Sequence, residues 1–377
     1  MESRREHIAY LDYLRLFAAA SVVYMHTAAA GLRGGVTLGW HGMNLVTSLA
    51  FTAVPLFFMI SGFLLLSDAR TLEPKVLLRR RLPRLVIPLA GWTVVSVLWD
   101  ALAARDFSLH FVGGKLLGAL YSPVLTPFWF MYTLIVLYVL SPLLCGGVRA
   151  MGKSGRRYVL VLTALVSLKA MLKAFLPDAL DHWLDVDVLN KLQALGGYLL
   201  IFLLGYYLGT LEKRIPNALL AVVAVVTYAV IVIGTWRLTV RQGEYMQAFQ
   251  SQAAGFEVLL AACLFLLAKQ NLDRDCVWLR RVPAVPLLLP IYFMHGVLIK
   301  MFNAVGLNPM HFPGTVGCTL LNLLICYFVM KTVATVKPIC YLATGMTYQK
   351  ACESCNWVYT VRRLREKNKA KEHGGDA

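Results

Sequence analysis

Apolar stretches about 20 residues long recur along the whole chain, and short polar segments separate them. An α-helix of this length crosses the hydrocarbon core of a lipid bilayer. We therefore expect an all-α polytopic membrane protein with about ten transmembrane helices. The expected spans are residues 10–30, 46–66, 85–104, 127–147, 158–176, 193–211, 216–235, 254–270, 284–303 and 313–333.

Composition and charge agree with a membrane protein and indicate its orientation. Hydrophobic residues make up 58% of the 377 positions, charged residues make up 15%, and the mean hydropathy is +0.63. These values exclude an ordinary soluble protein. With the amino terminus inside, about three quarters of the Lys and Arg residues fall on the inner side, as the positive-inside rule requires. We therefore expect both termini in the cytoplasm, and the net charge of +17 needs no nucleic-acid partner.

The distribution of charge also predicts the domain organisation. Residues 1–337 form the expected membrane domain, and residues 338–377 form a basic cytoplasmic tail. The end of that tail, from Arg362 to Ala377, is typical of a disordered segment.

The first expected span carries three polar side chains on one face: Asp12, Arg15 and His26. At about 100° per residue, His26 lies about three full turns beyond Arg15, and Asp12 is about 40° from the same line. A charge at the bilayer centre costs about 3 kcal/mol, so this face is expected to point into the protein or a wet cavity. Alternatively, Arg15 extends to the lipid headgroups and His26 only binds a neighbouring helix.

Isolated polar or aromatic residues also mark three later spans. Glu257 lies near the outer end of span 254–270, where an acidic side chain is unusual. Tyr292 and His295 share one face of span 284–303, although a single His in an apolar helix is usually a hydrogen-bonded core residue. Trp129, near the start of span 127–147, is also explained as an aromatic residue of the membrane interface.

The most basic segment lies at the inner end of span 85–104. It reads Arg79-Arg80-Arg81-Leu82-Pro83-Arg84. If this segment is helical, Arg81 and Arg84 are neighbours on one face, and their guanidinium groups can hold phosphate oxygens. On composition alone, anchoring to anionic lipid is the favoured interpretation.

The amino-terminal motifs resemble a known family. Tyr10-Leu11-Asp12-Tyr13-Leu14-Arg15, His26 and the segment containing Ser61-Gly62 together resemble the signature of bacterial membrane acyltransferase family 3. The family's pattern of Arg, ten residues and His is met by Arg15 and His26, and the resemblance continues along most of the chain. That family includes O-acetyltransferases of surface glycans, among them the one that acetylates enterobacterial common antigen. The resemblance implies a multi-pass enzyme of the bacterial inner membrane.

The same resemblance assigns a donor-binding segment and a fourth-helix motif. The family's Arg-x-x-Arg motif, implicated in coenzyme A use, falls on Arg81 and Arg84, which implies that these residues and Arg80 bind acetyl-CoA. Trp129 follows the family's fourth-helix pattern. Many relatives carry a His two residues before this Trp, whereas this chain has Pro127, so the role of that His cannot be transferred.

The resemblance extends to the penultimate helix. Tyr292 and His295 match the family's Tyr-x-x-His, although the Gly or Ser that commonly precedes it is Pro290 here.

Acetyl transfer from a thioester to a hydroxyl needs a base, an oxyanion stabiliser and a site that holds the donor. His26 is the candidate general base, because an unperturbed His pKa of about 6.5 leaves the ring largely neutral at working pH. Asp12 and Arg15 complete this catalytic face, with Arg15 orienting the donor. Tyr292 or His295 would assist proton transfer or stabilise the oxyanion.

The expected acceptor is an envelope glycan or a lipid-linked saccharide, and membrane lipids surround the protein. Trp129 and Glu257 are the candidate acceptor-binding residues. No metal is expected, because Cys352 and Cys355 have metal-ligand spacing but no second pair follows them.

Two other functions are consistent with the same residues. In a transporter, Asp12, Arg15, Glu257 and His295 would form a proton relay, although the sequence shows no inverted repeat. A glycan-binding membrane protein without catalysis is disfavoured, since both Arg15 and His26 are present.

Overall fold

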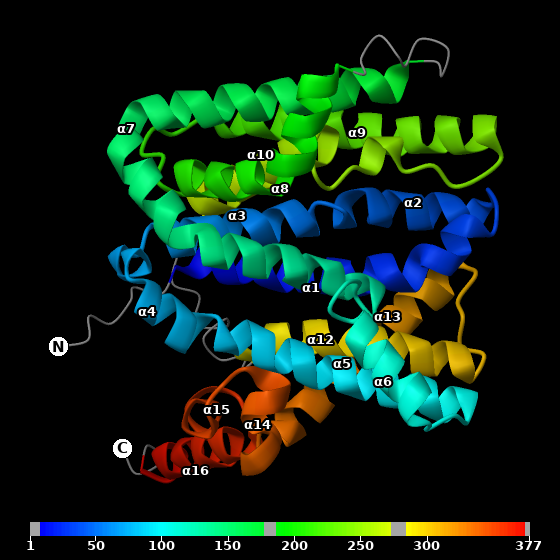
Figure 1. Ribbon diagram of the computed structural model, residues 1–377, viewed down its shortest axis with the longest axis vertical. Helices are drawn as coiled ribbons and strands as arrows, with labels where there is room; N and C mark the ends of the chain where they lie inside the picture. Colours follow the sequence, from blue (N-terminus) through cyan, green and yellow to red (C-terminus); the bar gives the residue numbers. More distant parts are fainter. Residues whose placement is uncertain (1–7, 177–185, 273–283, 374–377) are drawn as a thin grey trace. The chain divides into compact units, whose positions relative to one another are not determined.

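The computed structural model describes residues 8–176, 186–272 and 284–373, and in this part of the chain it contains helices and no β-strand (Figure 1). The chain folds into two compact units, each assembled from separate stretches. The first unit comprises Met1–Leu77, Val136–Cys276 and Leu307–Thr319. The second comprises Leu78–Ile135, Val277–Gly306 and Leu320–Ala377.

Long helices form most of both units. The first unit contains α1 (Ala9–Arg33), α2 (Leu38–Ala50), α3 (Ala53–Leu66), η1 (Ala69–Leu72), α4 (Pro74–Val76), most of α7 (Trp129–Phe175), α8 (Asp187–Gly209), α9 (Asn217–Gln242), η5 (Ala248–Gln250) and α10 (Phe256–Asn271). The second contains most of η2 (Leu77–Arg81), α5 (Pro83–Ala104), α6 (Leu109–Gly118), η3 (Thr126–Phe128), η6 (Val285–Leu287), α12 (Leu288–Ala304), most of α13 (Phe312–Val333), α14 (Lys337–Thr344), α15 (Tyr348–Ser354) and α16 (Trp357–His373).

The predicted all-α polytopic architecture is confirmed. Within the described residues, six helical segments are long and apolar enough to cross a membrane, and a pair bent by 62° within α8 raises the number to seven. The six segments are Leu38–Leu66, Pro74–Ala104, Thr126–Phe175, Asn217–Gln242, Val285–Ala304 and Phe312–Val333. Each of the ten expected spans overlaps a helix, but the number ten and the cytoplasmic location of the termini stay predictions.

The fourth and fifth expected spans lie within one long helical segment, α7. Gly152 breaks the helical geometry of this segment with φ 49° and ψ −126°. A side chain is disfavoured at a positive φ, so glycine suits the turn between the two arms. The expected boundary between two spans therefore coincides with a kink.

Close backbone contact joins α3 and α8 in the first unit. A Cβ atom added to Gly62 would lie 1.8 Å from the carbonyl oxygen of Phe202, and one added to Gly205 would lie 2.1 Å from that of Met59. Any side chain at either position would collide with backbone. Gly62 therefore permits close helix approach by the small-residue packing typical of membrane helices.

Polar side chains connect the helices of the second unit. The indole Nε1 of Trp92 in α5 donates a hydrogen bond to the carbonyl oxygen of Ala343 in α14 at 3.0 Å. Asp100 accepts from Lys115 at 2.7 Å and from Lys300 at 2.8 Å, which ties α5 to α6 and α12. Such bonds satisfy polar groups that would otherwise lie unpaired between apolar helices.

The carboxyl-terminal tail is helical where the structure describes it. Helix α16 covers Trp357–His373, so the expectation of disorder from Arg362 onward is wrong for residues 362–373. The amide of Asn356 donates to the carbonyl oxygen of Ala334 at 3.2 Å and fixes the start of this helix. The composition of the tail indicated disorder, because long-range contacts such as this one cannot be read from composition.

Candidate active site

The predicted site residues divide between the two units. The first unit holds Asp12, Arg15, His26 and Glu257. The second unit holds Arg80, Arg81, Arg84, Trp129, Tyr292 and His295.

Helix α1 presents the predicted polar face without interruption. Because α1 is continuous from Ala9 to Arg33, the helical spacing that aligns Arg15 with His26 applies to the structure. Arg15 Nη1 donates to Asp12 Oδ1 at 2.7 Å, three residues away. The Asp12 side chain is 9% exposed and that of Arg15 is 31% exposed. The carboxylate therefore orients a guanidinium group that still reaches the surface of the unit.

A loop from a distant part of the sequence lies beside the His26 turn. His26 is partly exposed, whereas the neighbouring Met25 is buried. The Gln252 side chain donates to the sulfur of Met25 at 3.8 Å. The segment before α10 therefore reaches α1 one residue from His26. Sequence analysis did not predict this contact.

A buried chain of polar groups holds that same loop in place. Tyr245 donates to the amide oxygen of Gln250, and the Gln250 amide nitrogen donates to the hydroxyl of Ser48 at 3.0 Å. Ser48 then donates to the amide oxygen of Asn44, and the Asn44 nitrogen reaches the carbonyl of Val232. These bonds connect η5 to α2 and α9, which explains the fixed position of the loop.

Glu257 is fully buried in the first turn of α10. The backbone enters this turn through Gly255, whose φ of 79° favours glycine. Neither carboxylate oxygen of Glu257 has a hydrogen-bond partner among the described residues. Burial raises the pKa of Tyr245, and the nearby Glu257 charge acts in the same direction. Glu257 is therefore a buried acidic group with unused hydrogen-bonding capacity close to the Tyr245 loop.

The arginine motif spans the junction of two helical elements. Arg81 ends the π-helical turn η2, Leu82 is the N-cap of α5 with helical backbone angles, and Arg84 lies in the first turn of α5, so the two arginines lie three residues apart across the junction. Arg80 and Arg84 are exposed, and Arg81 is half-buried. All three guanidinium groups are therefore within reach of the solvent or of a ligand.

The tail packs against the helix that carries this motif. Gly345 has φ 67°, and a Cβ atom there would lie 2.3 Å from the carbonyl oxygen of Arg84. Burial, and secondarily the charge of Arg84, lowers the pKa of Lys350. Lys350 therefore adds a further basic group near the motif. The only sequence signal for it was the basic character of the tail, since the resemblance did not extend to this segment.

The aromatic and histidine residues of the second unit make hydrogen bonds to backbone. The Tyr292 hydroxyl donates to the carbonyl oxygen of Pro127, and His295 Nδ1 lies 2.5 Å from the carbonyl oxygen of Tyr292. Because a carbonyl can only accept, Nδ1 carries the proton in this bond. Asn322 donates to the His295 carbonyl at 3.2 Å, and His295 is 0% exposed. Trp129 is half-buried at the start of α7.

Pro127, which stands where many relatives carry a His, has a structural role here. Its carbonyl accepts a hydrogen bond from the Tyr292 hydroxyl, a contact between residues far apart in the sequence that the motif comparison did not predict.

Both units provide groups suited to acyl transfer. In the first unit, the partly exposed imidazole of His26 can accept a hydroxyl proton, and in the second unit the guanidinium groups of the arginine motif can bind phosphate oxygens. Among the residues that the structure describes, no three His, Cys, Asp or Glu side chains are grouped closely enough to hold a metal ion.

Comparison with known proteins supports the same chemistry. A family model described as an acyltransferase domain, that of acyltransferase family 3, matches residues 8–331. Neither the curated proteins nor the solved structures contain a match to the chain. Because the family match spans most of the 377 residues, the protein belongs to acyltransferase family 3 and is a multi-pass membrane acyltransferase.

Proposed function

We propose that this protein is an O-acetyltransferase of the bacterial inner membrane. It transfers the acetyl group of cytoplasmic acetyl-CoA to a hydroxyl of an envelope glycan or lipid-linked saccharide. The observation that carries this proposal is the polar face of α1, where a partly exposed His26 follows the oriented Arg15 on the same helical line. Family membership supports acyl transfer rather than a proton-relay transporter.

In this mechanism His26 acts as the general base. Its neutral imidazole removes the proton of the acceptor hydroxyl while the oxygen attacks the thioester carbonyl. The carbon–oxygen bond forms, the carbon–sulfur bond breaks, and coenzyme A leaves as a thiolate. The imidazolium then returns its proton to that thiolate, which leaves His26 neutral for the next cycle.

The arginines hold the donor. Coenzyme A carries several phosphate groups, and a guanidinium group binds phosphate oxygens through paired hydrogen bonds. Arg80, Arg81 and Arg84 are exposed or half-buried, as this role requires. Arg15, held by Asp12, orients the thioester end of the donor or stabilises the oxyanion.

Trp129 is the proposed acceptor contact, because its half-buried ring offers a face for a sugar ring. The carboxylate of Glu257, predicted for the same role, can accept hydrogen bonds and has no partner among the described residues, but it is fully buried and does not reach the surface of its unit. For Tyr292 and His295 we propose a narrower role than the catalytic one expected from the motif. The Tyr292 hydroxyl already binds the carbonyl of Pro127, so we assign it to positioning α12, and His295 Nδ1 is already bonded to a carbonyl of its own helix.

Transfer of labelled acetyl from acetyl-CoA to endogenous envelope glycan tests the proposal. Membranes with equal amounts of the wild type, His26→Ala and the control His41→Ala are compared. His41 is another half-buried histidine of the first unit. We expect label in the wild type and the control and none above background in His26→Ala. Equal transfer by all three would exclude His26 as the base, and no transfer to any glycan would favour the transporter.

A second experiment tests the donor site. Arg84→Gln should raise the KM for acetyl-CoA about tenfold and leave the KM for the acceptor unchanged, since a charge-assisted phosphate contact is lost. Arg157→Gln, which removes an exposed cation from α7, is the matched control. An unchanged donor KM would remove Arg84 from the site.

A further inference from the structure

The last helix, α16, carries an apolar strip on an exposed face. Trp357, Val358, Val361 and Leu364 are 37%, 44%, 46% and 54% exposed, respectively. Trp357, Val361 and Leu364 recur at the helical spacing of three to four residues and so form one strip, with Val358 at its edge. Large apolar side chains are unusual on a water-facing helix that also carries several charges. This strip needs an apolar partner.

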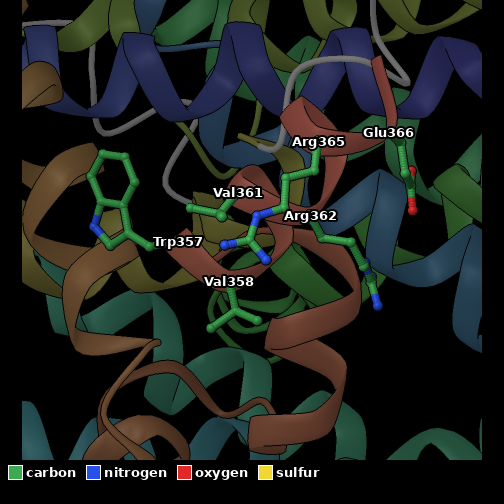
Figure 2. A pocket seen from close by; sticks show the side chains of 6 residues that line it. All are labelled: Trp357, Val358, Val361, Arg362, Arg365 and Glu366. Atoms are coloured by element: carbon green, nitrogen blue, oxygen red, sulfur yellow. The ribbon is translucent and has the colours of Figure 1, made fainter. Parts of the chain in front are cut away.

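Basic residues border the strip. Between Trp357 and His373 the sequence has six Lys or Arg residues and two Glu residues. Arg362 and Arg365 lie beside Val358 and Val361 around an open hollow of about 640 Å³, which Trp357 and Glu366 also line (Figure 2). No described acidic side chain forms an ion pair with either of these arginines. The partner is therefore expected to be anionic as well as apolar.

The start of α16 is fixed at the carboxyl end of a candidate membrane span. The Trp357 ring stacks on Phe328 of α13 with 6.3 Å between centroids and 14° between planes. Its Nε1 donates to the Thr332 hydroxyl at 3.0 Å. Lys331 Nζ lies 4.2 Å from the centre of the Trp357 ring. A Trp and a Lys at the end of a span are the usual residues of the membrane interface.

The apolar strip continues an exposed apolar stripe on that span. Leu320, Leu324 and Phe328 are 56%, 56% and 49% exposed and recur every four residues along α13. In a helix that crosses a bilayer, such a stripe faces lipid. Through the stack of Trp357 on Phe328, the lipid-facing surface of α13 passes directly into the strip of α16.

We propose that α16 is an interfacial helix that binds anionic phospholipid. Its apolar strip enters the boundary between headgroups and acyl chains, and Arg362 and Arg365 bind lipid phosphates at the border of the strip. This inference concerns a segment beyond residue 331, where the family match ends, and it does not depend on the proposed acetyl transfer.

Protease protection of the full-length protein in lipid nanodiscs tests the inference. A protease that cleaves after Glu reaches Glu366 within α16, and mass spectrometry measures release of the carboxyl-terminal fragment. Nanodiscs of phosphatidylcholine alone are compared with nanodiscs containing one part phosphatidylglycerol to two parts phosphatidylcholine. We expect cleavage at least about fivefold slower in the anionic nanodiscs, with the difference shrinking at high salt.

Two double variants separate the contributions of charge and apolar contact. Arg362→Gln with Arg365→Gln, and separately Val358→Asp with Val361→Asp, should each abolish most of the difference between the two lipids. The ratio of rates within one variant cancels any effect of the substitution on the protease itself. Arg149→Gln with Arg157→Gln removes two exposed charges from α7 and should keep the full difference.

Three outcomes would overturn the proposal. The first is equal protection of the wild type in both lipids, which would mean that α16 is shielded by protein alone. The second is an unchanged lipid difference in both double variants. The third is that free coenzyme A, added to phosphatidylcholine nanodiscs, slows cleavage as much as anionic lipid does. This result would make a soluble phosphate compound the ligand.

Discussion

His26 and His295 are both motif histidines on apolar helices, yet their surroundings differ. His295 is fully buried, its Nδ1 binds the carbonyl of Tyr292, and its own carbonyl accepts from Asn322. His26 is partly exposed on a face that also carries the Asp12–Arg15 pair. The difference shows that a motif match alone does not distinguish a fully buried histidine, whose ring is bonded within its own helix, from one that can meet a substrate.

The largest expected effect comes from His26. His26→Ala should lower kcat/KM for acetyl transfer by about 10²–10⁴-fold, the usual contribution of a general base. The melting temperature should stay near that of the wild type, because a partly exposed side chain contributes little packing. Transfer kinetics and thermal unfolding of the purified protein measure the two effects. A kcat/KM within twofold of the wild type would contradict the role of His26 as general base.

His295→Ala should have the opposite result. Removing a fully buried ring and its hydrogen bond should cost about 2–4 kcal/mol of unfolding free energy. Activity per folded molecule should fall only a fewfold. Thermal unfolding in detergent, together with transfer rates normalised to folded protein, checks this expectation. A normal melting temperature with complete loss of activity would instead make His295 catalytic.

Tyr292→Phe should show a smaller effect of the same kind. The substitution leaves the Pro127 carbonyl without its donor, at a cost of about 1 kcal/mol in a membrane protein. The melting temperature should therefore decrease slightly, and transfer should be retained. Tyr121→Phe, at a position that is 90% exposed, is the control and should change neither. Loss of transfer at an unchanged melting temperature would assign the Tyr292 hydroxyl to the chemistry.

The smallest expected effect is that of Asp12→Asn. The amide can still accept from Arg15, but the loss of charge weakens a pair whose carboxylate is 9% exposed and whose guanidinium group is 31% exposed. We expect kcat/KM to fall about threefold. Asp187→Asn, which alters the exposed pair with Lys191, should leave kcat/KM unchanged. If Asp12→Asn reduced transfer as strongly as His26→Ala, Asp12 would have a direct catalytic role.

The sequence by itself determined the class of this protein and part of its candidate site. Apolar segment length and helical periodicity are local properties, so they predicted an all-α membrane protein and the alignment of Arg15 with His26.

Only the tertiary structure decided which residues from distant parts of the sequence meet. It brought Gln252 to Met25, paired Tyr292 with Pro127, and packed the tail against Arg84. It also showed that α16 is helical where its composition indicated disorder. Such contacts depend on how side chains of different helices fit together and satisfy each other's polar groups, which the pattern along a single chain does not contain.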